Sequence, residues 1–488
     1  MKKILLSLDN LDDCFPDDFT DFQIAAAKTM FYKALASEMH KYYGGKMQTL
    51  PKAGIYGQNW FNVWYTPGVS AVSTAIRDDI QNSITLSNRG NLVAVVSDST
   101  RVLGDGDCGV FGGLGVMEGK AFLMKYLADV DAVALCIDNR DKKGKPNAQK
   151  VIDFVNMVSP SFGAVNLEDI SQPNCYKILD ELRDNCSIPV WHDDAQGTAC
   201  VILAGVINAL RLVEKDIADS KIVLLGSGAA NSCVAEYLLL LGADLEKMIL
   251  LDSKGGLHNK RYDIQKHLGF YRQWELCQKT NPKCIDDTSA ALQKADILIA
   301  LSAPGPDVVR PEWIAAMNQK PIVFACANPV PEIYPYAAKE AGAFIVATGR
   351  GDFPNQVNNS LGFPGILKGT LLTSSTKITD NMALSAARAL ADFTSQRDLH
   401  PEHILPLMNE AEAFAEVAEA VGQQAIRDKV ARVIYPEGEI RKTTLTAIQK
   451  TRATINKMTT EGFIKQPSID TIQQIFCNVI KDIQQGEI

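Results

Sequence analysis

Short apolar runs that alternate with helix-like segments dominate this chain and restrict the folds open to it. A first series of runs lies in residues 92–96, 132–137 and 164–167, and a second in residues 221–225, 248–251, 297–301, 322–326 and 343–347. Runs of this length, separated by helices, are typical of parallel strands that helices cover on both faces. Because 488 residues exceed one ordinary core, we expect a two-domain α/β protein.

The segments outside these runs are predicted to be helical. Residues 22–43 carry apolar side chains at helical spacing and are followed by Gly44, which favours a helix that ends there. Beyond residue 378 the chain is rich in alanine. Thr379 and Asp380 are predicted N-caps of one helix, and Pro401 is predicted to be the first residue of the next.

These patterns predict three parts. Residues 1–195 form an α/β domain, residues 196–436 form a doubly wound α/β domain with following helices, and residues 437–488 form a charged helical tail. The first domain holds the candidate substrate and metal residues described below.

Composition excludes several classes of protein. The net charge is −8 and no basic run is present, so nucleic acid is not an expected partner. The eleven cysteines are irregularly spaced, which predicts a reducing, cytoplasmic location. The apolar stretch 201–213 contains Asn208 and Arg211 and is shorter than the roughly 18 residues that cross a bilayer, so we expect a buried helix and no membrane partner.

A glycine-bearing turn at the start of the second strand series predicts a dinucleotide site of the Rossmann type. The turn directly follows a strand-like run, precedes a helical stretch, and consists of Gly226, Ser227, Gly228, Ala229, Ala230 and Asn231. The two glycines allow a tight turn and close approach of a pyrophosphate, whereas Asn231 takes the place of a third glycine. Asp252, which ends the next strand, would bond the ribose of NAD and disfavour NADP. An isolated turn of this kind is often purely structural.

Two acidic pairs follow predicted strands of the first series. Glu168 and Asp169 follow the run 164–167, and Asp193 and Asp194 follow a short strand-like lead-in at 188–190. Helix capping explains one such pair by itself. Two converging pairs instead favour a site for Mg²⁺ or Mn²⁺, which prefer oxygen ligands.

Tyr65 and Lys120 are candidate proton-transfer groups. Tyr65 precedes a Pro-Gly turn, and Lys120 follows Gly119 at the predicted start of a helix over 121–127. Taken singly, a tyrosine is more often a core aromatic and a lysine a solvated helix residue.

In combination these motifs resemble the malic enzymes, in the shorter form typical of prokaryotes. The resemblance runs from about residue 40 to about residue 432 and includes the segments YTPGVS, SDSTRVLGDGDCG, VMEGKA, FGAVNLEDI, PVWHDDAQGTA, CANPVPEI and ATGRGDFPNQVNNSLGFPGI. It implies oxidative decarboxylation of L-malate to pyruvate and CO₂ with NAD, or NADP, and Mg²⁺ or Mn²⁺.

The resemblance also implies roles for individual residues. Lys120 is similar to the family's base and Tyr65 to its acid, with Asp193 beside the lysine. The metal ligands would be Glu168, Asp169 and Asp194. The residues that would hold the substrate carboxylates and the nicotinamide are Arg101, Asn328, Asn358 and Asn359. A family member would also be a homodimer or homotetramer.

The chemistry suits these residue types. Removal of the C2 hydroxyl proton needs a base active near neutral pH, and a lysine close to a cation can have a lowered pKa. A metal that chelates the developing oxyanion favours loss of CO₂, and the enolate that remains needs an acid such as Tyr65. Arg101 could bind a carboxylate through two hydrogen bonds.

Three positions depart from the family pattern. They are Asp105, where an apolar residue is usual, Ala195 after the two aspartates, and Asn231 in the nucleotide turn. Asp105 could alter substrate preference or face solvent, and Asn231 could reduce cofactor affinity.

Alternative functions remain open at this stage. A malolactic-type enzyme would retain NADH and release lactate, and no single residue separates it from a malic enzyme. A catalytically silent cofactor-binding or regulatory homologue would lack turnover. Another two-domain dehydrogenase, such as one acting on amino acids, would work without a metal.

Overall fold

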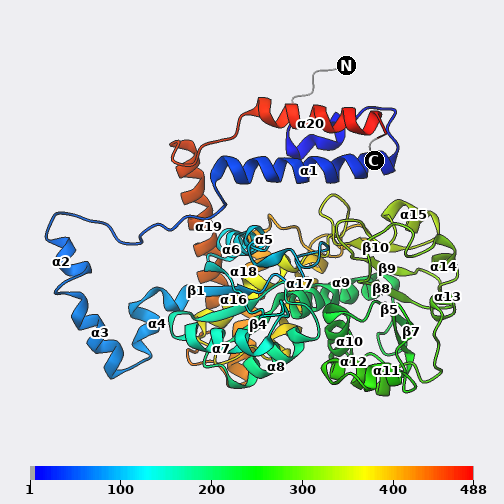
Figure 1. The fold of residues 1–488 in the computed structure, drawn as a ribbon, viewed down its shortest axis with the longest axis horizontal. Coiled ribbons are helices and arrows are strands. Elements are labelled where there is room, and N and C mark those ends of the chain that lie inside the picture. Colours follow the sequence, from blue (N-terminus) through cyan, green and yellow to red (C-terminus); the bar gives the residue numbers. More distant parts are fainter. Residues whose placement is uncertain (1–5, 487–488) are drawn as a thin grey trace. The chain divides into compact units, whose positions relative to one another are not determined.

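The computed structural model describes residues 6–486 and divides into two compact units (Figure 1). The smaller unit combines the two ends of the chain, up to Thr49 and from Arg452 onward, and the larger unit comprises Leu50–Thr451.

In the smaller unit an N-terminal helix packs against a C-terminal one. Helix α1 (Asp21–Tyr43) begins at Thr20, whose side chain accepts a hydrogen bond from the backbone of Gln23, and ends at Gly44 in the left-handed conformation. Helix α20 (Ile469–Gln484) lies against it, with Phe476 edge-on to Phe31. The predicted first helix and the helical nature of the tail are therefore confirmed. The unit also contains the short helix η1 (Leu8–Cys14).

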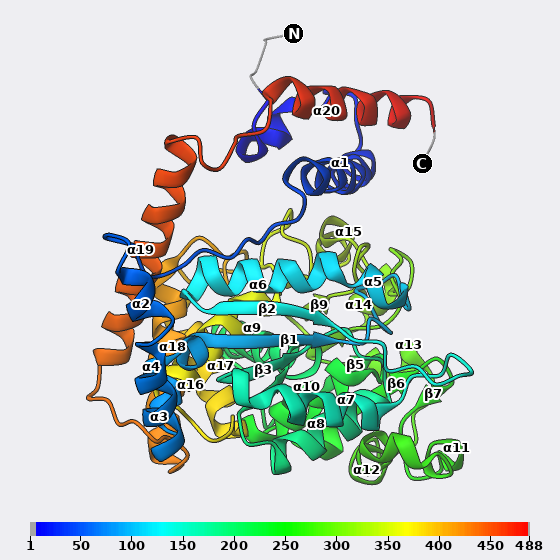
Figure 2. The same ribbon diagram turned by 60° about the vertical axis from the view of Figure 1, so that its left-hand side comes forward.

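The first sheet of the larger unit has four parallel strands in the order β2-β1-β3-β4. Figure 2 shows β2, β1 and β3 of this sheet beside one another. The strands are β1 (Leu92–Ser97), β2 (Asp131–Cys136), β3 (Ala164–Leu167) and β4 (Val190–His192). Alternate residues of β1 face opposite layers: Val93 and Val95 pack toward helix α6 (Leu114–Ala128), and Ala94 and Val96 toward helices α7 (Ala148–Val158) and α8 (Asn174–Asn185). Strands β1, β3 and β4 are thus buried, as apolar runs predict, whereas the edge strand β2 is only partly buried.

The second sheet has the order β10-β9-β8-β5-β6-β7, parallel except for the edge strand β7. The strands are β5 (Ile222–Leu225), β6 (Met248–Asp252), β7 (Gly255–Gly256), β8 (Ile297–Ala300), β9 (Ile322–Ala325) and β10 (Ile345–Thr348). Helices α9 (Thr198–Val213) and α10 (Ala229–Leu241) pack on one face, and α13 (Thr288–Leu292), α14 (Pro311–Ala315) and α15 (Pro335–Glu340) on the other. The predicted doubly wound domain is confirmed.

The remaining helices connect or cover the two sheets. They are α2 (Trp60–Trp64), α3 (Val69–Asp78), α4 (Asn82–Leu86), η2 (Asn88–Asn91), α5 (Gly109–Gly112), η3 (Ser159–Ser161), η4 (Asp193–Gly197), η5 (Leu245–Lys247), α11 (Tyr262–Gln265), η6 (Leu268–Phe270), α12 (Tyr271–Lys279), η7 (Asn359–Leu361), α16 (Phe363–Leu372), α17 (Asp380–Ser395), α18 (Ala411–Arg427) and α19 (Glu439–Thr460). Helix α19 runs across the boundary between the two units.

Two details of the helix predictions are wrong. Lys120 lies in the middle of α6, not at a helix start, because burial of Met117 and neighbouring residues extends the helix back to Leu114 in spite of its glycines. Pro401 does not begin a helix. It lies in a tight turn in which the backbone N–H of His403 donates to the carbonyl of His400, and α18 begins ten residues later at Ala411. Thr379 is confirmed as the N-cap of α17.

The apolar stretch predicted to be a buried helix is α9. Together with η4 it forms the segment Asp193–Val213, which is long and apolar enough to cross a membrane, but 78% of its most apolar window is buried inside the protein. This is the burial of a core helix.

Candidate active site

The four acidic residues predicted as a site lie at one edge of the first sheet. Strands β3 and β4 are hydrogen-bonded parallel neighbours, so the residues that follow them emerge side by side. The backbone N–H of Asp169 donates to Asp194 Oδ2 at 2.7 Å, and ligand oxygens of Glu168, Asp169 and Asp194 all lie within 4.8 Å of one another. The structure therefore brings the three predicted metal ligands together.

The protein gives these carboxylates few hydrogen-bond partners of their own. Glu168 and Asp169 are buried, and Asp169 Oδ2 has no hydrogen-bond partner among the described residues. Burial, with the adjacent charge of Glu168, raises the pKa of Asp169 to about 7. Burial and the charge of Asp169 likewise raise the pKa of Asp194 to about 7. A set of three oxygen ligands, two of them buried and one partly exposed, with an orphaned oxygen fits a hard divalent cation.

Neither acidic pair acts as a helix cap, which was the alternative explanation for acidic residues at these positions. Helix α8 begins five residues after Asp169, and Asp169 itself adopts the left-handed conformation with φ 55°. Asp193 is in the first turn of the π-helix η4, but its side chain bonds side chains of the site.

Lys120 joins the carboxylates from α6. Its side chain is only about 9% exposed, and its Nζ donates to Asp193 Oδ2 at 2.5 Å and to Asn359 Oδ1 at 3.2 Å and lies 3.0 Å from Glu168 Oε1. Burial lowers the pKa of Lys120, but the attraction of Asp193, Glu168 and Asp194 outweighs burial and raises the pKa above its ordinary value. The expected lowering depends on a nearby cation and is not produced by the protein's own groups.

Supporting residues that the sequence analysis did not select hold this cluster in place. Asn166 donates to Glu168 Oε2 at 2.9 Å, and Trp191 Nε1 donates to Asp193 Oδ1 at 3.3 Å. A side chain at Gly197 would place its Cβ 1.9 Å from Asp193 Oδ1, so only glycine fits there. The sequence contained a signal for these two residues. Side chains two positions apart in a strand point to the same face, and Asn166 is two residues before Glu168 and Trp191 two before Asp193.

The predicted substrate residues reach the site in different ways. Asn359 contacts Lys120, whereas Asn358 caps η7 by accepting from the backbone of Ser360. The backbone N–H of Arg101 donates to the carbonyl of Asp169 at 3.0 Å, and its side chain is exposed. Asn328 lies against the same loop, because a Cβ on Gly104 would come within 2.2 Å of the Asn328 carbonyl oxygen.

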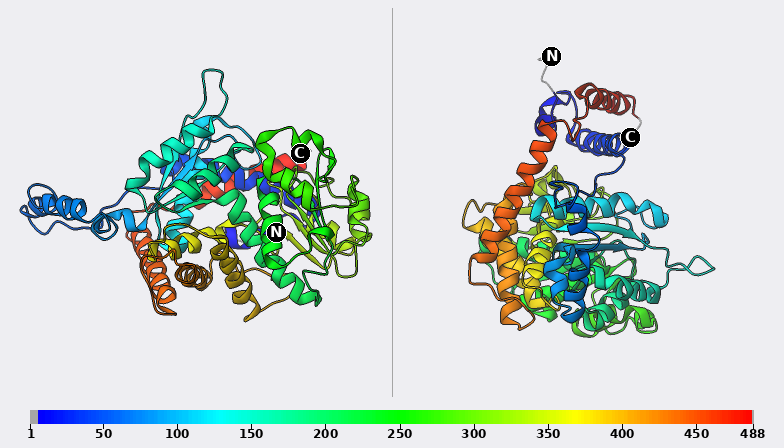
Figure 3. Two further views of the ribbon diagram at one scale, coloured as in Figure 1. Left: turned by 90° about the horizontal axis from the view of Figure 1, so that it is seen from below. Right: turned by 90° about the vertical axis from the view of Figure 1, so that its left-hand side faces the viewer.

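Tyr65 is not brought to the Lys120 cluster. It follows the last residue of α2 and is 74% exposed. Figures 1 and 3 show α2 and α3 extending away from the sheets of the larger unit. The prediction that Tyr65 acts with Lys120 is therefore not met within one copy of the described chain.

The dinucleotide turn has the predicted shape. Gly226 adopts φ 98°, and a Cβ there would come within 2.3 Å of the Leu301 carbonyl oxygen. Gly228 caps α10 and a Cβ on it would meet nothing within 4 Å, which leaves open space at a helix N-terminus. Asn231 is buried and donates to the carbonyls of Leu225 and Gly226 at 2.9 Å each. Asn231 thus braces the turn in place of a third glycine.

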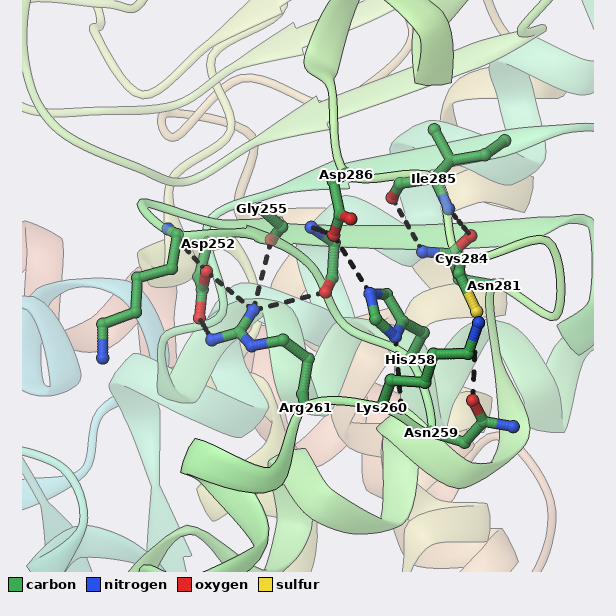
Figure 4. A network of polar contacts seen from close by, with 12 residues as sticks. Asp252, Gly255, His258, Asn259, Lys260, Arg261, Asn281, Cys284, Ile285 and Asp286 are labelled. Carbon is green, nitrogen blue, oxygen red and sulfur yellow. Dashed lines mark hydrogen bonds and ion pairs between the residues drawn. The ribbon is translucent and has the colours of Figure 1, made fainter.

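Asp252 lies at the end of β6 as predicted, but its carboxylate is already bonded. Arg261 donates to both of its oxygens, at 3.0 and 2.7 Å, and to both oxygens of Asp263 (Figure 4). The backbone N–H of Lys254 also donates to Asp252 Oδ1. The acid expected to face the ribose is therefore half of a buried ion pair, which the sequence did not reveal because Arg261 is nine residues away.

Comparison with known proteins agrees with this geometry. Residues 44–183 match the model of the malic enzyme N-terminal domain, and residues 195–426 match that of the malic enzyme NAD-binding domain. The chain belongs to the malic enzyme family. It is 41% identical to the NAD-dependent malic enzyme of Geobacillus stearothermophilus over 390 residues, 80% of this chain and 78% of that protein.

Further relatives support the same assignment. The bifunctional malic/malolactic enzyme of Bacillus subtilis is 37% identical and is matched over 97% of its length and 84% of this chain. The crystal structure of Entamoeba histolytica malic enzyme superposes with a TM-score of 0.96 at 53% identity, covering 98% of this chain and 99% of that one. The predicted family, its two-domain α/β fold and its NAD(P)-binding domain are confirmed.

Of the departures from the family pattern, Asp105 is exposed and Ala195 is buried. Asp105 therefore meets solvent in this structure.

Replacing one of the buried carboxylates should separate metal binding from folding. In Asp169→Asn the amide tolerates the left-handed backbone but cannot serve as a charged ligand. A carboxyl group whose pKa is raised in the folded chain contributes stability at low pH that is lost as the pH rises toward 7. We expect the variant, measured without metal at pH 8, to be more stable than the wild type by about 2 kcal/mol in denaturant titrations and to lose stabilisation by Mn²⁺.

The matched control is Asp184→Asn, at an exposed aspartate on α8. It should leave both the unfolding midpoint and the effect of Mn²⁺ unchanged. A destabilised Asp169→Asn protein that still responds to Mn²⁺ would contradict the assignment.

Proposed function

We propose that this protein catalyses the oxidative decarboxylation of L-malate to pyruvate and CO₂ with reduction of NAD⁺ or NADP⁺. The observation that carries the proposal is the cluster in which Lys120 contacts Asp193, Glu168 and Asn359 beside the three metal-ligand candidates. A dinucleotide turn in the neighbouring sheet and family membership support it.

In this proposal the first proton transfer involves Lys120. Divalent metal bound by Glu168, Asp169 and Asp194 would supply positive charge that stabilises the substrate's developing oxyanion. The same positive charge would weaken the attraction that raises the pKa of Lys120, so that its amine can accept the proton of the C2 hydroxyl. Asp193 and Asn359 hold the amine in position.

Other residues would orient the substrate and the cofactor. The exposed guanidinium of Arg101, whose backbone is tied to Asp169, is placed to bind a substrate carboxylate. Bound at the turn that begins with Gly226, the nicotinamide cofactor would accept the hydride from C2. Asn328 lies against the loop that carries Arg101, and Asn358 directly precedes Asn359, which contacts Lys120.

We also propose that a second copy of the chain supplies the acid, Tyr65. The segment around α2 exposes aromatic side chains that a single copy leaves in water, namely Tyr56, Phe61, Trp64 and Tyr65. Exposed aromatic clusters of this kind mark surfaces of association. A dimer in which the segment around α2 of each copy reaches the partner's Lys120 would bury these side chains and complete both sites. A tetramer built from such dimers would do the same.

The domain boundaries and the compartment complete the proposal. We place a substrate and metal domain in residues 1–195, a dinucleotide domain in 196–436 and a helical tail in 437–488, since one strand series lies on each side of residue 195. A cytoplasmic location is supported by the eleven cysteines, all of which are free.

The reaction is tested by mixing the protein with L-malate, Mn²⁺ and either NAD⁺ or NADP⁺. We expect reduced cofactor and pyruvate in equal amounts, and no turnover with Lys120→Ala. Lactate without net reduced cofactor would instead establish the malolactic alternative, which the similarity to a bifunctional relative keeps in view. Full activity in excess chelator would contradict the metal-dependent mechanism.

Shared active sites predict complementation between two inactive variants. Tyr65→Phe and Lys120→Ala should each lose at least 99% of activity as separate proteins. After the two are mixed under conditions that exchange subunits, mixed dimers contain one intact site, so about a quarter of wild-type activity should return. No recovery, despite exchange shown by differently tagged chains, would mean that Tyr65 and Lys120 act within one copy.

The ion pair of Asp252 and Arg261 is expected to set the preference for NAD⁺. With Asp252 in place, its charge and that of Asp263 surround the guanidinium and disfavour a 2′-phosphate. In Asp252→Ala the guanidinium gains free donors, so the ratio of kcat/KM for NAD⁺ to that for NADP⁺ should fall at least tenfold. Asp263→Ala, which keeps the Asp252 pair, should change the ratio much less, and equal effects of the two variants would contradict this role.

A further inference from the structure

We propose that the turn after α17 is a second cation site, built from Asp398, His400 and His403 and suited to a zinc-type divalent ion. Ligand atoms of the three side chains lie within 4.8 Å of one another. None of the three is a residue of the active-site cluster.

The turn holds its two imidazoles close together. The backbones of His400 and His403 form a bridge, and their ring centroids are 5.7 Å apart. His400 Nε2 lies 3.6 Å from Asp398 Oδ2. A tetrahedral ion with bonds of about 2.1 Å keeps its ligand atoms roughly 3.4 Å apart, so this pair needs little movement.

The hydrogen bonding of His403 leaves one ring nitrogen available to a metal ion. Its Nδ1 donates to the carbonyl oxygen of Asp398 at 2.8 Å, so its Nε2 carries the free lone pair. That Nε2 is shielded from solvent and has no hydrogen-bond partner among the described residues. A backbone carbonyl that fixes the tautomer in this way is the usual support of a ligating histidine.

The other two ligands are free to adjust. His400 and Asp398 are exposed. A metal bond to His400 Nε2 would leave the ring proton on Nδ1, so the long 3.3 Å contact that Nδ1 accepts from the backbone N–H of Glu402 would be lost. Glu402 is engaged by Lys339 and does not compete. Two imidazoles with one carboxylate select a borderline ion such as Zn²⁺ over Mg²⁺, which the all-carboxylate site fits.

The turn is joined to the active site through Asn355. The buried Asn355 donates to the carbonyl of Pro401 at 2.8 Å and accepts from the backbone N–H of Ile404 at 2.9 Å. Asn358 and Asn359 follow in the same loop, and Asn359 contacts Lys120. A bound ion would stiffen the turn, and with it this loop; the link to catalysis, unlike the ion site itself, rests on the proposed function.

The test uses the full-length Asp169→Asn protein, in which the carboxylate site is disabled. Zn²⁺ is titrated into this protein by calorimetry, and hydrogen exchange of residues 350–359 is measured with and without Zn²⁺. We expect one zinc site and slower exchange in that segment. Adding His403→Gln should weaken zinc binding at least tenfold and abolish the protection, whereas adding His267→Gln, at an exposed histidine elsewhere, should change neither.

Unchanged zinc affinity in the His403→Gln protein, or the absence of zinc binding in its parent, would overturn the proposal. If His403→Gln does not fold, Asp398→Asn replaces it, because that exposed side chain makes no packing contribution to the core and should weaken zinc binding by the same mechanism. These results do not depend on malate turnover, so the site and the proposed activity can fail separately.

Discussion

The structure is organised around like charges that strand pairing forces together. Because β3 and β4 are adjacent and parallel, the residues that follow them converge, and both strands are followed by two acidic residues. Burial, together with the repulsion between neighbouring carboxylates, raises the pKa values of Asp169 and Asp194. Lys120 supplies one balancing charge. A divalent cation would supply the remaining positive charge. The repulsion that destabilises the metal-free protein would therefore favour binding of such a cation.

Much of the fold could be predicted because its signals are local. Apolar runs gave every strand of the two sheets except the short strands β4, of which only a lead-in at 188–190 was evident, and β7; Gly44 and Thr379 ended and began helices as expected. Local signals gave wrong predictions where packing between distant residues sets the ends of a helix. Glycines in α6 suggested a helix start at Lys120, yet burial of Met117 carries the helix through them. At Pro401 the pairing of two turn residues prevailed over the preference of proline for a helix start.

The candidate site shows the same division. Residues on the ends of neighbouring strands could be grouped from sequence, since topology alone brings Glu168, Asp169 and Asp194 together. Partners from distant segments could not. Asn231 looked like a defect in the nucleotide turn and proves to brace it, and Asp252 looked free and proves to be paired with Arg261. Tyr65 shows a further limit, because it is exposed in the single chain and its proposed contact with a second copy cannot be derived from one sequence.

The central proposal is that the converging carboxylates form a cation site. Crystals of the full chain grown with Mn²⁺ and measured near the manganese absorption edge would locate the ion directly. We expect an anomalous peak bonded to Glu168, Asp169 and Asp194, with Lys120 close by and not coordinated. A structure with these side chains ordered and no peak between them, or with the manganese bound elsewhere, would contradict it.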